Sequence, residues 1–286
     1  MNLLRLAALL TATVLLAACA SNSGNDDYAE RMAREHAEET PEASGAAAMV
    51  PRVEVAGEEV LYGTVDGKPL RGYLAHPVAG ADTLPGILVI HEWWGLNDNI
   101  RAMARRLAGE GYAALAVDLY GGESAGDPQA ARRLMQAAMQ DRQAGIRNLA
   151  AAADFLRGRG AERLGTIGWC FGGGWSLQAA LQLPEQVDAA VMFYGQPVTD
   201  PQELARLDAP LLGLFGGADR GIPVDTVRRM EAELEQLGKP ATIHVYPDAN
   251  HAFANPSGQS YDAAAAEDAW RRTTAFFAAH LKEGES

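Results

Sequence analysis

The sequence predicts an α/β protein whose central sheet is mostly parallel, with helices on both faces. Short apolar runs alternate along the chain with longer segments in which apolar residues recur at helical spacing. Residues 87–90, Ile-Leu-Val-Ile, are apolar without a break, as expected of a strand buried on both faces. Ile100, Met103 and Leu107 then follow at the spacing of one helix face. Repeated alternation of this kind predicts parallel strands joined by helical crossovers.

The remaining elements are predicted from the same two patterns. Residues 53–55 and 72–75 predict two antiparallel strands, with a turn around Asp66 and Gly67 between them. Further buried strands are expected at 113–117, 164–169, 189–194, 210–215 and 241–246. Helices are expected over 127–155, as one segment or two, from about residue 172, and over 224–237 and 263–281. The carboxyl ends of such strands meet at one edge of the sheet, where active sites of α/β proteins assemble.

The first residues predict a targeting signal. Arg5 precedes an apolar run at 6–16 that is too short to span a bilayer. The run ends in Leu-Ala-Ala-Cys, which resembles the lipobox of bacterial lipoproteins and makes Cys19 the expected site of lipidation. Residues 1–18 are therefore expected to be a lipoprotein signal peptide. The protein would be exported to the bacterial cell envelope and anchored in a membrane, with the periplasmic face of the outer membrane favoured. The alternative is an ordinary secretory signal cut nearby.

The chain after the signal divides into two regions. Residues 19–49 are expected to form a flexible tether with a marginal helix near 28–39, because they contain too few large apolar residues to pack a core. Residues 50–286 are expected to form the folded domain. The net charge of −13 argues against nucleic acids and anionic lipid surfaces as partners. Two cysteines without a metal-binding spacing predict neither a disulfide framework nor a metal site. The oligomeric state is open, with a monomer favoured.

The strongest chemical signal is Gly-Trp-Cys-Phe-Gly at residues 168–172, which has the form of a nucleophile elbow. It follows a predicted strand and opens a predicted helix. A sharp turn there exposes the thiol of Cys170 above the sheet, and the helix N-terminus favours the thiolate. Glycines two residues before and after Cys170 leave room for the turn. The alternative is a buried core cysteine beside glycines that merely permit tight packing.

A general base and an acid are expected to follow the nucleophile in chain order. His251 follows the strand at 241–246, and Asp219 follows the strand at 210–215. His251 would take the thiol proton, and Asp219 would orient the imidazole ring. Asp248 is the rival acid, although it lies only three residues from His251. The other histidines have no such context and are expected to be ordinary; they are His36, His76, His244 and His280.

The loop at 91–95, His-Glu-Trp-Trp-Gly, follows the strand at 87–90. In this arrangement the backbone N–H groups of Trp93 and Phe171 would form the oxyanion hole. Glu92 could accept the thiol proton, keep the thiol neutral by repelling a thiolate, or be a structural carboxylate. Trp94 either lines the pocket or only covers the edge of the sheet.

With these residues placed, the chain resembles the dienelactone hydrolase family over about 53–281. The segments that carry the resemblance are 91–97, 116–120, 168–173, 216–223 and 251–253. The resemblance implies an α/β-hydrolase fold, no cofactor, and a triad of Cys170, His251 and Asp219. It also implies that Glu92 exchanges a hydrogen bond with the thiol when substrate binds.

The resemblance has two departures at the substrate site. Family members that hydrolyse dienelactone grip the substrate carboxylate with arginines, and this chain has glycines at 121–122 and Asn255 at those places. Arg220 could compensate, and Tyr120 is a further candidate pocket residue. The resemblance therefore predicts the reaction class, hydrolysis of a small ester or lactone through a thioester acyl-enzyme. The alternatives are a non-catalytic envelope lipoprotein that uses the fold for binding, and an acyltransferase.

Overall fold

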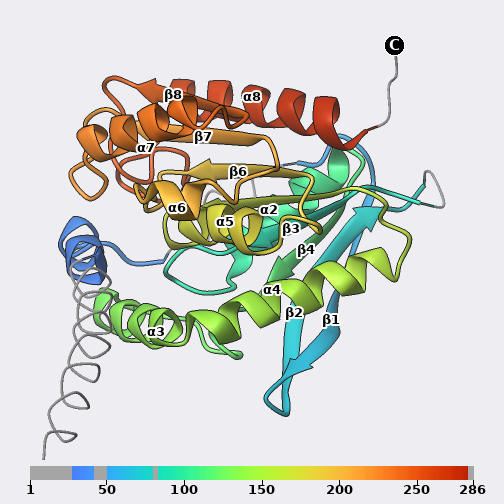
Figure 1. Cartoon of the computed structure of the whole chain (residues 1–286). Coiled ribbons are helices and arrows are strands. Elements are labelled where there is room, and N and C mark those ends of the chain that lie inside the picture. The colour runs from blue at the N-terminus through green and yellow to red at the C-terminus, as the bar shows by residue number, and fades with distance from the viewer. Residues whose placement is uncertain (1–27, 42–49, 80–82, 283–286) are drawn as a thin grey trace, which may run out of the picture.

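The computed structural model describes residues 28–41, 50–79 and 83–282, which fold around one eight-stranded sheet (Figure 1). The predicted signal peptide and Cys19 lie outside the described residues and stay predictions. The strands are β1 (Val55–Val65), β2 (Lys68–Pro77), β3 (Gly86–Ile90), β4 (Ala113–Val117), β5 (Leu164–Trp169), β6 (Ala189–Phe193), β7 (Leu211–Gly216) and β8 (Ala241–Tyr246). The helices labelled in Figure 1 are α2 (Asp98–Gly109), α3 (Pro128–Gln140), α4 (Arg142–Arg157), α5 (Phe171–Gln182), α6 (Pro201–Leu204), α7 (Val224–Gln236) and α8 (Ala263–Leu281). Residues 28–35 are also helical.

The strands lie in the order β1-β2-β4-β3-β5-β6-β7-β8. β2 pairs antiparallel with both β1 and β4, and every later pair is parallel. The predicted turn between β1 and β2 is confirmed: Asp66 and Gly67 both have positive φ, 51° and 76°. Two such residues form the tight turn whose twist matches a hairpin. The mostly parallel sheet predicted from the alternating pattern is therefore confirmed.

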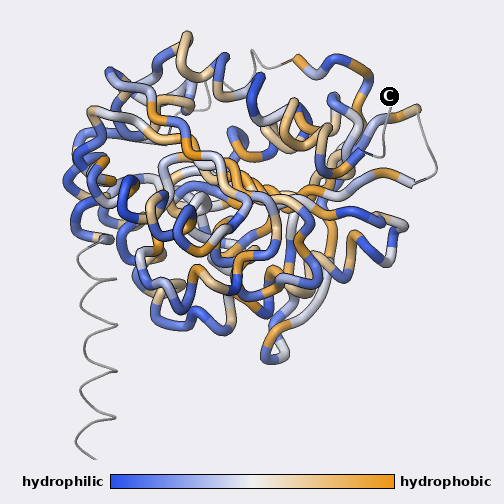
Figure 2. The backbone as a smooth tube through the Cα atoms, turned by 45° about the horizontal axis from the view of Figure 1, so that its top comes forward, coloured by the Kyte–Doolittle hydropathy of each residue, from blue (hydrophilic) through white to orange (hydrophobic). Residues whose placement is uncertain are grey.

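Helices cover both faces of the sheet, as adjacent residues of β5 show. A Cβ placed on Gly165 would lie 2.8 Å from Phe277 of α8. Thr166, the next residue, points to the other face, where its hydroxyl lies 2.9 Å from that of Ser176 on α5. Because successive side chains of a strand point to opposite faces, α8 and α5 lie on opposite sides. Figure 2 shows the apolar strands as an orange band inside the more polar helices.

Two elements differ from their predicted extent for local reasons. β1 continues for 11 residues, well beyond the short segment expected, because it pairs along nearly its whole length with β2. The long alanine-rich stretch divides into α3 and α4 at Asp141, whose side chain accepts a hydrogen bond from the amide of Ala144 at 2.9 Å. Such a cap satisfies an amide that the new helix leaves free. None of the described helices is both long enough and apolar enough to cross a membrane.

Residues 28–41 depart from the flexible tether that we expected. The predicted marginal helix is present at 28–35, but it packs against the domain. Tyr28, Ala29 and Met32 are buried. Arg31 donates to the carbonyl of Gly221 at 3.2 Å, and Glu30 forms an ion pair with Arg132 of α3. The expectation failed because a few apolar residues on one helix face suffice when the domain already offers a concave surface.

Candidate active site

Cys170 occupies the sharp turn between β5 and α5. Its φ of 52° lies in the left-handed region, which is strained for a residue other than glycine. The flanking glycines are required by close backbone contacts. A Cβ on Gly168 would lie 2.1 Å from the carbonyl oxygen of Gly172, and a Cβ on Gly172 would lie 2.3 Å from that of Ile90. The turn geometry that the motif predicted is therefore present, and it places the thiol at the N-terminus of α5.

The structure brings His251 and Asp219 together behind the thiol. His251 Nδ1 lies 2.7 Å from one carboxylate oxygen of Asp219, and both side chains are buried. The other carboxylate oxygen accepts the amide of Ile222 at 2.8 Å. With Nδ1 bonded to a carboxylate, the proton resides there and Nε2 is left as the basic nitrogen. The rival acid, Asp248, is exposed and does not contact His251 in the described part of the chain.

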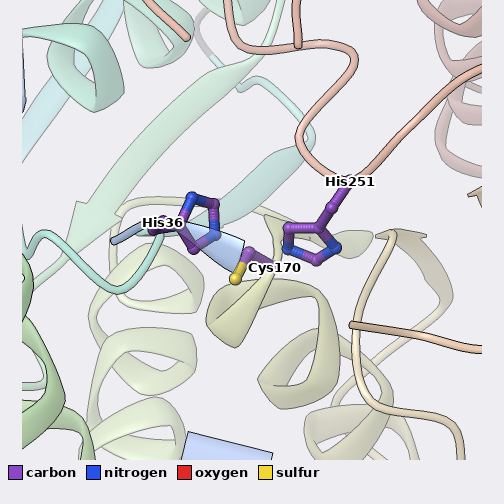
Figure 3. Close-up of side chains that lie close together, drawn as sticks. All are labelled: His36, Cys170 and His251. Atoms are coloured by element: carbon purple, nitrogen blue, oxygen red, sulfur yellow. The ribbon is translucent and has the colours of Figure 1, made fainter. Parts of the chain in front are cut away.

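The thiol lies between two imidazole rings, one of which sequence reasoning dismissed. Figure 3 shows Cys170 between His251 and His36, which belongs to the N-terminal segment. The two rings are 5.2 Å apart between centroids. Burial alone would raise the pKa of the Cys170 thiol, but the positive charges of His251 and His36 lower it to about 6, against an ordinary 9. The pKa of His251 is raised well above its usual value, against the effect of burial, by the charges of Cys170 and Asp219. The site therefore favours a thiolate–imidazolium pair.

This pairing predicts how the reactivity of the thiol depends on pH. The thiolate is the reactive form, and a pKa of about 6 means that it is formed as the pH rises through 6 and is nearly complete above 7. We expect the alkylation rate of Cys170 by iodoacetamide, measured by peptide mass spectrometry with chelator present, to follow that curve. The midpoint should move to higher pH in His36→Gln, which removes one positive charge. A midpoint near 9 in the unmodified protein would contradict the pairing.

Glu92 is buried and held by Asn255, whose amide nitrogen donates to it at 3.0 Å. Burial and the charge of Cys170 raise the pKa of Glu92 to about 8, so its carboxyl is protonated at neutral pH. Asn255 is the residue found where the resemblance implied an arginine. Because an amide carries no charge, it satisfies the carboxyl without drawing it into an ion pair.

The loop at 91–95 is fixed by contacts with the segment after β4. His91 accepts the amide of Leu119 through Nε2 at 3.1 Å, so its Nδ1–H donates to the carbonyl of Glu92 at 2.5 Å. The hydroxyl of Tyr120 donates to the carbonyl of Trp93 at 3.1 Å. Tyr120 was predicted as a pocket residue, and the structure adds that it supports the loop. The amide groups of Trp93 and Phe171 donate to no other residue within the described ranges.

The two remaining predicted pocket residues, Trp94 and Arg220, differ in where they lie. Trp94 is buried and its ring lies 4.8 Å from that of Trp93, so it is part of the wall around the site. Arg220 is exposed, and it forms no hydrogen bond or ion pair with any described residue. A cavity of about 500 Å³ adjoins the site, and its wall includes Tyr28 and Phe171, the residue after Cys170.

The N-terminal segment covers the thiol directly. The sulfur of Met32 lies 3.6 Å from that of Cys170, which is only 1% exposed. His36 packs on Trp93, with ring centroids 4.8 Å apart. A substrate carbonyl would have to approach Cys170 through the space that these side chains fill.

We therefore expect removal of this cover to increase hydrolysis. A chain that starts at residue 50 should show kcat/KM at least about tenfold above the full chain for a bulky ester, because opening no longer competes with binding. In the full chain, Arg132→Glu should give a smaller rise, since it repels Glu30 without touching the site. Equal kcat/KM in all three proteins would show that the segment does not restrict access.

Comparison with known proteins shows the family of the chain. The model of the dienelactone hydrolase family matches residues 70–281. The chain belongs to the dienelactone hydrolase family. It is 34% identical to protein usf of Aquifex pyrophilus, over 76% of this chain and 96% of that protein. It is 30% identical to a protein of Saccharolobus solfataricus whose name assigns it provisionally to the carboxymethylenebutenolidases, over 77% of this chain and 97% of that protein. The predicted family is thereby confirmed.

Solved structures of the family share the fold. A dienelactone hydrolase-like promiscuous phosphotriesterase from metagenomic libraries matches with a TM-score of 0.73 and 26% identity, covering 79% of this chain and 99% of that one. The dienelactone hydrolase fold, and with it the predicted α/β-hydrolase architecture, is confirmed. Residues 28–41, which cover Cys170, lie outside the part that the family model matches.

Sequence reasoning missed several residues that line the site, among them His36, Met32 and Tyr194. His36 was taken as ordinary, yet it lies beside Cys170. A signal was available, because Tyr28, Met32 and His36 are spaced by four and thus share one helix face. Tyr194, which has a φ of 35° and packs edge-on against His251 at 5.2 Å, follows β6 at the same sheet edge. Its position at the end of a buried strand is the sequence signal that could have identified it as a site residue.

Proposed function

We propose that the protein hydrolyses small carboxylic esters or lactones, with Cys170 as the nucleophile. One observation carries this proposal: a cysteine on a strained strand-to-helix turn faces a histidine whose other nitrogen is bonded to a buried aspartate. A hydrolase that acts on ester or lactone bonds is what membership of the family supports. The assignment of Cys170 as the nucleophile goes beyond what membership of the family supports.

The mechanism follows from the positions of these groups. The Cys170 thiolate attacks the substrate carbonyl carbon, and the carbonyl oxygen gains the negative charge. The unpaired amides of Phe171 and Trp93 supply hydrogen bonds to that oxygen. When the C–O bond breaks, the imidazolium of His251 protonates the leaving oxygen, and a thioester remains. Water, deprotonated by the same ring, then attacks the thioester, and the carboxylic acid leaves as the thiolate reforms.

Glu92 contributes by staying neutral. Its raised pKa of about 8 means that its proton is retained while Cys170 is ionised, so the two groups do not repel each other at neutral pH. A protonated carboxyl can donate a hydrogen bond into the site, which a carboxylate cannot. This assignment argues against two of the roles that the sequence left open, since a protonated carboxyl neither accepts the thiol proton nor repels a thiolate.

The substrate is expected to lack a carboxylate near the scissile bond. Asn255 replaces one arginine implied by the family, glycines replace the other, and Arg220 makes no contact with the site. Without a guanidinium at these places, a substrate carboxylate would lack the paired, charge-assisted hydrogen bonds that an arginine supplies. We therefore favour neutral esters and lactones over dienelactone itself.

Trapping the acyl-enzyme tests the proposal. The full chain is mixed with p-nitrophenyl acetate, quenched in acid within seconds and analysed by intact-protein and peptide mass spectrometry. We expect one acetyl group on the peptide that contains Cys170, and steady release of acetate with water as acceptor. Faster turnover with added alcohols, with ester products, would favour the acyltransferase. No acyl adduct and no turnover of esters or a lactone panel would favour a binding protein.

A further inference from the structure

The cover places one more donor atom, from His36, beside Cys170 and His251, and ester hydrolysis does not require it. His36, Cys170 and His251 each offer one donor atom, and these atoms lie within 4.8 Å of one another. All three residues are buried. His36 comes from the N-terminal segment, whereas the other two come from the family domain, so the cluster exists only when the segment is in place (Figure 3).

Both histidines have the arrangement typical of metal ligands. His36 Nδ1 lies 2.7 Å from Glu39 Oε2, and His251 Nδ1 lies 2.7 Å from Asp219 Oδ2. In each ring the carboxylate holds one proton on Nδ1, so Nε2 is the nitrogen that offers its lone pair once the imidazolium gives up its second proton. Both Nε2 atoms are buried and have no hydrogen-bond partner among the described residues. Metal-binding histidines almost always donate their other N–H in this way, often to a carboxylate, which fixes the tautomer and strengthens the ligand.

We propose that His36, Cys170 and His251 bind one Zn²⁺ ion. Thiolate sulfur and imidazole nitrogen are ligands that zinc prefers, at about 2.3 Å and about 2.0–2.1 Å. Tetrahedral bonds of these lengths would hold the donor atoms roughly 3.3–3.7 Å apart, so the cluster must close by about 1 Å. His36 stands at the end of the short helix and can supply that movement. Three protein ligands leave the fourth position to water.

Binding would couple the metal to the closed state of the enzyme. The thiolate sulfur and the two Nε2 atoms bind the ion, the Nε2 protons of the imidazolium rings pass to solvent, and no redox step is involved. The same sulfur and the same Nε2 that acyl transfer needs are then occupied by the ion. Zinc would therefore inhibit hydrolysis and hold residues 28–41 over the site, because one of its three ligands belongs to that segment.

The test is a direct titration of the full chain, freed of metal with a chelator, against Zn²⁺ in competition with a chromophoric chelator. We expect one Zn²⁺ per chain, with binding at least about 100-fold weaker in His36→Ala and in Cys170→Ala. Glu39→Gln leaves all three ligands and should weaken binding by about 10–100-fold through its effect on His36. His280→Ala, an exposed histidine of α8, is the matched control and should bind as the unmodified protein does.

A second readout identifies the ligands. Co²⁺ in the same chain should give a thiolate-to-metal charge-transfer band that is lost in Cys170→Ala, and Zn²⁺ should displace it. The proposal is overturned if the unmodified chain binds no Zn²⁺, or if His36→Ala binds it as tightly, since Cys170 and His251 would then suffice. Because these measurements use no substrate, they succeed or fail independently of the proposed hydrolase activity.

Discussion

Cys170→Ala is expected to lower kcat/KM for p-nitrophenyl acetate by about 10⁴-fold or more, which corresponds to roughly 5.4 kcal/mol of lost transition-state stabilisation. The reason is that the covalent route requires the sulfur, and no other side chain at the turn can form a thioester. Residual hydrolysis would come from the amides of Phe171 and Trp93 and from His251 acting on water. The measurement is initial rate against substrate concentration, with chelator present.

A second variant and a stability measurement show whether the loss of activity is specific to the nucleophile. Cys170→Ser retains the shape of the turn and a hydroxyl, so it should lie between the unmodified protein and Cys170→Ala, because an alcohol is far harder to ionise than this thiol. The melting temperature of each variant is measured alongside, because the thiol is buried between two imidazole rings and its removal must be separated from a loss of the fold. Turnover by Cys170→Ala equal to that of the unmodified protein would remove Cys170 from the mechanism.

The fold was predictable from the sequence because its signals are local. Uninterrupted apolar runs such as 87–90 indicate buried parallel strands, and the turn at Asp66 and Gly67 needs residues that tolerate positive φ. The placement of Cys170, His251 and Asp219 was also predictable, since each lies in the segment that follows a strand. Parallel strands bring their carboxyl ends to one edge whatever the details of packing.

What could not be predicted depends on contacts between distant segments. His36 lies beside Cys170 only because the helix at 28–35 packs against the domain, and no local sequence pattern encodes that packing. The partner of Glu92 was equally hidden, because Asn255 and Glu92 are 163 residues apart. Long-range pairing of this kind decides the electrostatics of the site, including the low pKa of the Cys170 thiol.

Asp219→Asn is expected to lower kcat by about 10³–10⁴-fold while leaving the fold intact. Asp219 accepts two hydrogen bonds, one from His251 Nδ1 and one from the amide of Ile222 at 2.8 Å. An asparagine must place its oxygen towards Ile222, which can only donate, so its NH₂ group faces His251. Nδ1 must then accept, and the ring proton moves to Nε2, the nitrogen that should take the proton of Cys170. The base is thus present in the wrong tautomer.

The matched control is Asp248→Asn, at the exposed carboxylate that the sequence left as the rival acid. It should keep kcat within about twofold of the unmodified protein, because Asp248 does not touch His251. Steady-state rates and the pH dependence of Cys170 alkylation distinguish the two variants. Asp219→Asn should also raise the pKa of the Cys170 thiol, because a less basic His251 stabilises the thiolate less. The reverse pattern, with Asp248→Asn inactive and Asp219→Asn active, would assign the acid to Asp248 and would require the loop at 247–251 to rearrange when substrate binds.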